Sequence, residues 1–309
     1  MMHSDSPADS NHSVSKSLPG ITPYSTTYRL TIPRDRRDSK GPTPKAARTL
    51  KTRAGYTLLE LMVTIAIVLL LVTLAGTGLK QSRSKARQVA CENNFRQLIL
   101  TWNLYSADHQ ERLVSNVHLD LTSGWVRGSV RGTGATNTLH LVDPEGALFA
   151  PYLPVWDVYR CPADESSEVI QGIEHPRVRS VSMNQAMGFE SYAIWLPSKA
   201  LAHPGQQYYL TYRLSTDIQE PSERFVFVDE SEVTINDPAF AVEMPQQNRS
   251  PRWIDVPTTR HRQSGVLAFA DGHVETHRWK DPRTSTDHFD KSAEHNEDWL
   301  WLTTRTSAE

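Results

Sequence analysis

The sequence predicts an α+β fold in which a long N-terminal helix packs against an antiparallel β-sheet. Residues 61–79 are mostly apolar and include no charged residue. After them, apolar residues recur every three or four positions up to about His109. This change of pattern indicates a single long helix whose N-terminal part is apolar on all sides and whose C-terminal part is amphipathic. The later part of the chain has short β-rich segments separated by turn residues. A helix followed by a series of strands is the order found in α+β domains.

The composition divides the 309-residue chain at about residue 55. Residues 1–55 hold ten Lys and Arg against four Asp and Glu, whereas the remainder holds 23 against 31. The first segment, rich in Ser and Pro, is predicted to be a disordered basic leader. A basic segment before an apolar helix and an acidic domain after it follow the positive-inside rule, with a cytoplasmic N-terminus and an exported domain. A basic tail can also bind nucleic acid, but the acidic domain argues against such a partner, because phosphate contacts need clustered Lys and Arg.

Residues 56–79 are predicted to form a single membrane-crossing helix in the inner membrane. The uncharged stretch 61–79 is close to the roughly 20 apolar residues that span a bilayer. An uncleaved signal anchor would need no more than this and flanking positive charge. A secretory signal peptide is a second interpretation, although the apolar stretch is long for one. Neither accounts for Glu60, a carboxylate at the point where the helix would enter the membrane.

The stretch "AGYTLLELMVTIAIVLLL" favours a third interpretation, a prepilin-type leader. Gly55, the aromatic Tyr56 and Glu60, followed by a long apolar helix, resemble the leader of type IV pilins and type II secretion pseudopilins. The resemblance implies that a prepilin peptidase cuts after Gly55 and methylates the new N-terminus at Tyr56, where the family usually has Phe. It also implies that Glu60 pairs with the N-terminus of a neighbouring subunit during filament assembly. A Glu60 side chain that reaches the lipid headgroups is the simpler alternative.

The helix is expected to continue beyond the membrane as an amphipathic extension over residues 80–113. Apolar residues recur there at steps of four, three, four and three, which is the spacing of one helix face. These residues are Cys91, Phe95, Leu98, Trp102 and Tyr105. Packing of this face against the sheet of the domain is the preferred interpretation, and a groove for a partner is the alternative.

The exported domain, residues 114–309, is predicted to contain strands and loops. The candidate strands are residues 124–130, 177–183, 207–213, 224–229 and 265–279. Turn-rich pieces such as "VDPEG" and "EPSE" separate them. We therefore expect a sheet built from the C-terminal two thirds of the chain.

A second resemblance covers this domain. The segments "ACENNFRQL", "YRCPADES", "FVFVDES" and "RHRQSGVLAFADGHVE" follow in order the pattern of a large pseudopilin-like family with a prepilin-type processing-associated H-X9-DG domain. His261 is followed by nine residues and then by Asp271 and Gly272, so the spacing is met. The resemblance implies a pilin-like fold and a filament or secretion machine, without an individual role.

The segment 261–279 is predicted to form a β-hairpin. Asp271 and Gly272 lie between two strand-like runs, which indicates a two-residue type I′ turn. Such a turn would place Leu267, Phe269 and Val274 on one face, toward the helix. His261 would then anchor the chain that enters the hairpin. A catalytic or metal-binding pair formed by His261 and Asp271 is the functional alternative.

Cys91 and Cys161 are the two cysteines of the chain. An exported domain lies in an oxidising compartment, where a disulfide between them would fix the helix to the domain. The bridge would close a loop of about 70 residues and contribute roughly 4 kcal/mol in the chain-entropy model. Two separate buried thiols are equally consistent with the sequence.

Motifs for catalysis and cofactor binding are not evident, so we expect a protein that is not an enzyme and needs no cofactor. Walker A, dinucleotide-binding and nucleophile-elbow patterns are missing. His273 and His277 would lie about 13 Å apart along a strand, too far to share one zinc ion. Residues 229–237 and 290–298 offer oxygen ligands for calcium but lack EF-hand spacing.

Two classes of function follow from the sequence. The first is a structural subunit of a type II secretion or type IV pilus-like filament, with prepilin peptidase, other pilin subunits and the inner membrane as partners. The second is a membrane-anchored exported binding module, for instance for polysaccharide, that uses the leader for targeting. Aromatic residues would serve sugar binding in that case, although most are expected to pack internally. They are Trp195, Tyr208, Tyr209, Trp299 and Trp301.

Overall fold

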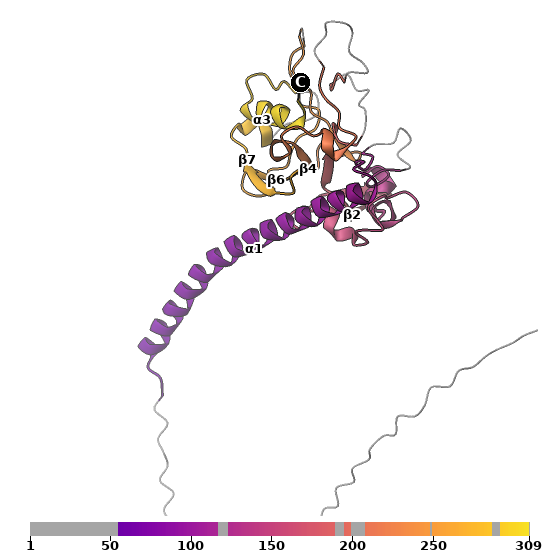
Figure 1. The fold of residues 1–309 in the computed structure, drawn as a ribbon. Helices are drawn as coiled ribbons and strands as arrows, with labels where there is room; N and C mark the ends of the chain where they lie inside the picture. Colours follow the sequence, from indigo (N-terminus) through magenta and orange to yellow (C-terminus); the bar gives the residue numbers. More distant parts are fainter. Residues whose placement is uncertain are drawn as a thin grey trace, which may run out of the picture. The chain divides into compact units, whose positions relative to one another are not determined.

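A computed structural model describes residues 55–116, 123–188, 195–198, 208–247, 249–285 and 291–308, with the side chains of residues 74–80 outside the described set. The leader up to residue 54 lies outside these residues, as do the side chains of the last six residues of the expected membrane helix. The chain divides into two units at residue 57, and the fold below is that of the second unit, residues 58–309. It is an α+β fold, as predicted (Figure 1).

Helix α1 (Leu58–Asp108) is a single helix of 51 residues, about 77 Å long at 1.5 Å per residue. It begins two residues after the predicted start at Tyr56, and it ends near His109, where the apolar pattern stops, five residues before the predicted end of the extension at residue 113. The helix ends where Gln110 and Glu111 adopt left-handed backbone angles, with φ of 57° and 62°. Such residues commonly terminate helices because they turn the chain out of the helical path. No helix among the described residues is long and apolar enough to cross a membrane.

Two sheets follow α1. A two-stranded hairpin is formed by β1 (Ser167–Ile170) and β2 (Ile173–Pro176). A five-stranded sheet has the order β5-β3-β4-β6-β7, antiparallel except for the parallel pair of β3 and β5. Its strands are β3 (Val181–Asn184), β4 (Phe225–Asp229), β5 (Ala239–Phe240), β6 (Ser264–Phe269) and β7 (Val274–Arg278). Every residue of β3, β4 and β6 is buried, so the centre of this sheet is covered on both faces.

Shorter helices connect and cover these strands. They are α2 (Leu139–Val142), α3 (Glu297–Thr306) and the 3₁₀ helices η1 (Gly132–Thr136), η2 (Trp156–Tyr159), η3 (Ser215–Asp217), η4 (Pro221–Glu223) and η5 (Pro282–Ser285). Helix α3 was not predicted, although the sequence contains its start signal. The Asn296 side chain accepts hydrogen bonds from the backbone N–H of Asp298 and Trp299, and two acidic residues occupy the first turn. This is a standard N-cap.

Helices α1 and α3 lie against opposite faces of the β7 edge of the sheet (Figure 1). On one face, the Thr276 hydroxyl donates a hydrogen bond to Glu92 of α1 (2.8 Å) and accepts one from Gln88 (3.1 Å). On the other face, the ring of His277 stacks on Trp301 of α3, with ring centres 3.7 Å apart. Consecutive strand residues point to opposite faces, so these contacts fix which helix covers which face.

The amphipathic face of α1 packs into the core as predicted. Cys91, Phe95, Leu98 and Trp102 are fully buried, and Tyr105 is partly buried at the edge of the same hydrophobic cluster. Val266 and Ala268 pair across the hairpin with Thr276 and Val274, so they belong to the α1-facing side of the sheet. The C-terminal half of α1 is therefore part of the domain core.

Two of the predicted strands are wrong. Residues 124–130 form turns, because Gly128 has a left-handed φ of 72° and a side chain at Gly124 would meet backbone oxygens at 3.0 Å. Of residues 207–213, position 207 lies outside the described residues, and the rest makes only isolated bridges, at Tyr209 and Tyr212. The predicted strand 177–183 is shorter, since β3 begins at Val181.

The β6–β7 hairpin forms where predicted, but its turn is different. Phe269 N–H donates to the His273 carbonyl and Gly272 N–H donates to the Phe269 carbonyl, both at 2.9 Å. The loop therefore contains the three residues 270–272, of which Gly272 alone has a positive φ, 95°. This is a type I turn followed by a left-handed glycine, and not the predicted type I′ turn. The Asp271 carboxylate accepts from the His273 backbone N–H (3.0 Å) and so stabilises this conformation.

The extra loop residue shifts the register of β7 by one position. Val274 pairs with Ala268, and Glu275 pairs with Leu267. A shift by one residue reverses the side-chain faces. Val274 consequently lies on the α1 side, whereas Leu267 and Phe269 lie on the opposite side, so the prediction that all three face the helix is wrong.

Candidate functional site: an exposed N-terminal segment and a buried cysteine–histidine cluster

The predicted cleavage position lies in an exposed, non-helical segment. Gly55, Tyr56 and Thr57 precede α1 in the sequence and are not helical. The Tyr56 side chain is 89% exposed, and a side chain built at Gly55 would meet no atom within 4 Å. An exposed, non-helical peptide bond between residues 55 and 56 is a suitable substrate for a peptidase.

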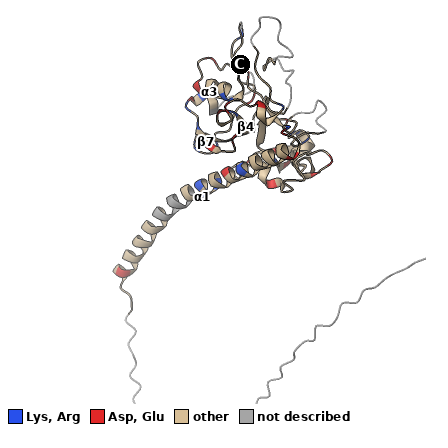
Figure 2. Ribbon diagram, viewed as in Figure 1, with Lys and Arg blue, Asp and Glu red and all other residues tan. Residues whose placement is uncertain are grey.

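The first half of α1 exposes an apolar surface on all sides. All described side chains from residue 58 to 73 are exposed, and Glu60 in the first turn is the one charged residue among them. Figure 2 shows this half as uncharged except for the acidic residue at its start. The hydroxyls of Thr64 and Thr73 donate to the carbonyls of Leu61 and Leu70, so they present no unsatisfied donor. An apolar surface of this extent needs a hydrophobic environment.

A second candidate site lies inside the domain and contains three of the residues singled out in the sequence. Cys91 on α1, Cys161 after η2 and His261 before β6 meet Asp229 at the end of β4. All four are buried, and their ligand atoms lie within 4.8 Å of one another. The His261 Nε2 is 3.2 Å from the Cys161 Sγ, and the Cys91 Sγ is 4.0 Å from the Asp229 Oδ2. Both cysteines are free thiols in the structure, so the predicted disulfide stays a prediction.

Neighbouring groups hold these side chains in place. The Ser180 hydroxyl accepts the Cys161 backbone N–H (2.9 Å) and donates to the Asp229 Oδ1 (2.8 Å). The Arg260 guanidinium also donates to this oxygen, at 2.9 Å. Asp229 therefore presents its second oxygen, Oδ2, to Cys91. The backbone N–H of Ala163 donates to the Cys161 sulfur at 3.4 Å.

The electrostatics of the cluster follow from its burial. Burial raises the pKa of Asp229 to about 6, although Arg260 opposes this effect. The hydrogen bond between the two sulfurs raises the pKa of Cys91, together with burial, and the same bond lowers the pKa of Cys161. His261 lowers the pKa of Cys161 further. Cys161 is thus the more acidic thiol, and the four groups have the chemistry of metal ligands.

His261 and Asp271 do not meet. Strand β6, about 17 Å long at 3.3 Å per residue, separates them. Asp271 contacts His273 instead, with its Oδ1 2.6 Å from the His273 Nδ1. The His261 backbone N–H donates to the Ser264 carbonyl at the start of β6, and the predicted role of His261 as an anchor of the hairpin stays a prediction.

Sequence reasoning missed two members of the second site, Asp229 and Arg260. Asp229 was noted only as a candidate oxygen ligand in the segment 229–237. Its position at the end of a buried strand was the available signal, because a carboxylate there is buried and requires partners. Arg260 supplies part of this pairing and also contacts Asp164 (3.3 Å) and Glu232 (2.8 Å).

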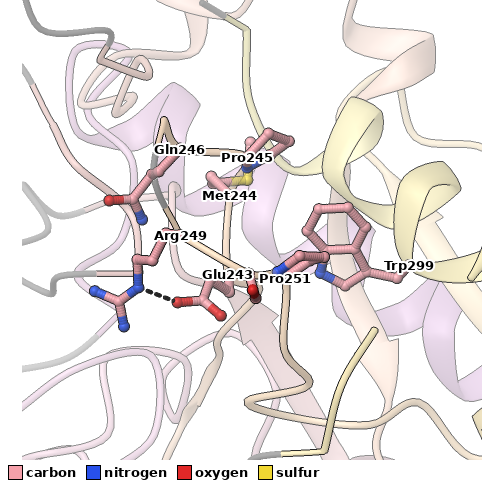
Figure 3. Close-up of a pocket in the computed structure, with 8 residues that line it drawn as sticks. Glu243, Met244, Pro245, Gln246, Arg249, Pro251 and Trp299 are labelled. Atoms are coloured by element: carbon pink, nitrogen blue, oxygen red, sulfur yellow. Dashed lines mark ion pairs between the residues drawn. The ribbon is translucent and has the colours of Figure 1, made fainter. Parts of the chain in front are cut away.

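The aromatic residues considered for sugar binding mostly pack internally. Tyr209 and Trp299 are buried, Trp195 and Trp301 pack against the core, and Tyr208 is exposed. Trp299 lines a cavity of about 110 Å³, shown in Figure 3. Glu243, Met244 and Arg249 also line it, with Arg249 and Glu243 forming an ion pair at 2.6 Å. Among the described residues, the buried Trp299 indole N–H has no hydrogen-bond partner.

Comparison with known proteins identifies the N-terminal segment. Residues 50–76 match the family described as the prokaryotic N-terminal methylation motif. No curated protein and no solved structure matches the chain. The match ends before the second half of α1 and does not extend to His261, Asp271 and Gly272. The chain therefore carries a prepilin-type N-terminal methylation motif, the feature typical of pilin-like substrates of prepilin peptidase.

Proposed function

We propose that this protein is a pilin-like structural subunit of a type II secretion or type IV pilus-like filament. Prepilin peptidase cleaves after Gly55 and methylates Tyr56, and the subunit then assembles through the first half of α1. The C-terminal domain is exported, and the protein is not an enzyme. One observation supports this most strongly: the methylation motif over residues 50–76 includes the start of a helix whose side chains from residue 58 to 73 are all exposed and, except for Glu60, uncharged.

The apolar side chains of the exposed half of α1 are covered first by lipid and later by neighbouring subunits. Before assembly, lipid covers its apolar side chains, with the N-terminus cytoplasmic and the helix crossing the inner membrane. In a filament, the same side chains pack against helices of neighbouring subunits. The in-helix hydrogen bonds of Thr64 and Thr73 suit both environments, since neither hydroxyl needs water.

Glu60 is the group that gives assembly its register. A carboxylate in an apolar environment is costly, on the order of 2.5–3.5 kcal/mol at mid-membrane and less near the edge. Cleavage at Gly55 creates a free amine on Tyr56. An ion pair between Glu60 and the amine of a neighbouring subunit offsets that cost, and it forms at only one axial offset between the helices.

The second half of α1 packs against the domain of its own chain, so only the first half is available for packing between subunits. The domain covers the face of Phe95 and Trp102. Helix packing between subunits would then use the exposed side chains of residues 58–73, which is the pilin-like arrangement.

Processing is tested by intact-mass and N-terminal analysis of the protein extracted from membranes. We expect a mature chain that begins with N-methylated Tyr56. The Gly55→Glu variant should remain as full-length precursor, because the peptidase reads the glycine. A mature N-terminus at another position, for instance after Ala75, would exclude prepilin processing.

Assembly is tested with Glu60→Val, which should be cleaved and inserted normally but should not enter filaments released by shear. Thr64→Val, one helical turn further on, is the matched control and should assemble. Normal assembly of Glu60→Val would show that the carboxylate does not pair subunits.

An exported binding module is the second candidate, favoured by the cavity beside Trp299, whose indole N–H finds no hydrogen-bond partner in the part of the chain that the structure describes. Its volume, about 110 Å³, is well below the 300–1,000 Å³ typical of ligand pockets. Shear separates the two functions, since an anchored module stays with the membrane and filament subunits are released as polymers.

A further inference from the structure

The buried cluster of Cys91, Cys161, Asp229 and His261 has the composition of a zinc site. Two sulfurs, one imidazole nitrogen and one carboxylate oxygen are all ligand types that Zn²⁺ accepts in tetrahedral sites. The residues come from four separate segments of the chain and converge within 4.8 Å. We propose that these four residues bind a structural zinc ion that fixes α1 to the sheet.

The distances are close to those of a tetrahedral site. Metal–ligand bonds of about 2.0–2.3 Å place neighbouring ligand atoms roughly 3.3–3.8 Å apart. The His261 Nε2 and Cys161 Sγ are 3.2 Å apart, and the Cys91 Sγ and Asp229 Oδ2 are 4.0 Å apart. These two separations would change by a few tenths of an ångström on binding of the ion, and the other separations, all within 4.8 Å, would close by at most about 1–1.5 Å.

The surroundings match the charge of such a site. Two thiolates and one carboxylate with a dication leave one negative charge. The Arg260 guanidinium, bonded to the Asp229 Oδ1, compensates it. The backbone N–H of Ala163 that donates to the Cys161 sulfur is the kind of outer hydrogen bond that orients thiolate ligands.

The burial of all four ligands indicates a structural role. Catalytic zinc keeps an open position for water or substrate, whereas structural zinc is enclosed by four protein ligands. Because the ligands lie on segments far apart in the sequence, binding the ion is coupled to folding of the whole domain. The inference is independent of processing at Gly55.

A disulfide and a zinc ion exclude one another here. A Cys91–Cys161 bond would use both sulfurs and remove the two thiolate ligands from the site. The two states are distinguishable in the isolated protein, because the disulfide form lacks two hydrogen atoms and does not react with thiol reagents after unfolding.

The test begins with the full chain in detergent, isolated from the cell envelope without chelators. We expect about one zinc ion per chain by elemental mass spectrometry and two thiols that react after unfolding. Replacement by Co²⁺ should give thiolate-to-cobalt charge-transfer absorption and tetrahedral d–d bands. Removal of the ion with a chelator should lower the unfolding midpoint by about 10 °C.

Cys91→Ser, Cys161→Ser and Asp229→Asn should each reduce zinc occupancy at least tenfold. His273→Gln, at the exposed hairpin tip, is the control and should retain the ion. If the variants do not fold, the cobalt spectrum of the unaltered chain decides. A zinc-free native chain, a disulfide-linked chain, cobalt binding without thiolate absorption or full zinc occupancy in folded cysteine variants would each overturn the proposal.

Discussion

The two halves of α1 contain similar apolar residues and have opposite surroundings. In residues 58–73 the large apolar side chains are at least half exposed, whereas in residues 81–108 one stripe, which includes Phe95 and Trp102, is fully buried. The difference lies in the pattern. An apolar stripe can be buried by one neighbouring sheet, but a helix that is apolar on all sides requires cover from every direction. The pattern thus separates what this chain buries by itself from what needs a membrane or other subunits.

Of the substitutions considered, Phe95→Ala, in the buried half of α1, is expected to destabilise the domain most. Removal of a fully buried aromatic side chain should lower the free energy of unfolding of the domain by about 3–5 kcal/mol. Leu100 lies on the opposite, solvent side of the same helical segment and is 58% exposed, so Leu100→Ala should cost less than about 1 kcal/mol. Urea denaturation of the full chain in detergent measures both. Equal losses would mean that the stripe does not distinguish the faces of the helix.

Leu69→Lys addresses the exposed half. A lysine in the middle of the apolar segment should disfavour membrane insertion by about 3 kcal/mol, while the unfolding of the domain should be unchanged. Fractionation of cells into membrane and soluble protein, with Leu69→Ile as control, measures insertion. Unchanged membrane association, or a destabilised domain, would contradict the separation of the two halves.

Gly272→Val affects the hairpin that borders the buried half of α1. With φ of 95°, a β-branched residue is strained there, and the expected loss is about 1–3 kcal/mol. Space is not the cause, since an added Cβ would meet only the Asn103 side chain, at 3.7 Å. Gly272→Asn should cost less, because Asn tolerates positive φ. If the unaltered protein and Gly272→Val unfold at the same temperature, backbone strain at position 272 is excluded.

The smallest expected effect concerns His277, on the face of the sheet that contacts α3, and it is measured as a pH dependence of stability. Burial lowers the pKa of His277 to about 4. Between about pH 6.5 and 4, His277 is protonated in the unfolded chain and neutral in the folded chain. The stability that the domain gains from the neutral His277 is therefore complete above pH 6.5 and is lost as the pH falls toward 4. The loss should be at most about 2 kcal/mol, because the ring is partly exposed to solvent. His277→Phe, which keeps an aromatic ring against Trp301, should flatten the stability curve in this window. Identical curves for both proteins would show that His277 does not contribute.

The elements that were predicted correctly have strong local patterns. The second half of α1 has a helical period, and β4 and β6 are short runs of mostly apolar residues bounded by turns. Residues 124–130 have an apolar composition typical of a strand, but the tight approach at Gly124 and the left-handed Gly128 produce turns. The hairpin register was missed for a similar reason, because the Asp271 carboxylate bonds to the His273 amide and stabilises a three-residue loop.

The buried cluster was only partly predictable. Cys91 and Cys161 were paired from the expected compartment, and His261 was noted from a resemblance. Nothing in the local sequence relates them to Asp229, since the four residues have no short spacing of the kind that marks zinc motifs. Their convergence depends on strand pairing and on how α1 lies against the sheet, which are tertiary properties.

The contacts between α1 and β7 also have a consequence for the folding of the chain during its synthesis. The hydrogen bond from Thr276 to Glu92 joins residues 184 positions apart, and the bond from Gln88 to Thr276 spans 188. Contacts of such long range form late and slowly, because the intervening chain must first lose its freedom. Because the chain is made from its N-terminus, the apolar stripe of α1 is synthesised well before the strands that cover it. The nascent domain is therefore most vulnerable to aggregation in this interval, before β6 and β7 have formed.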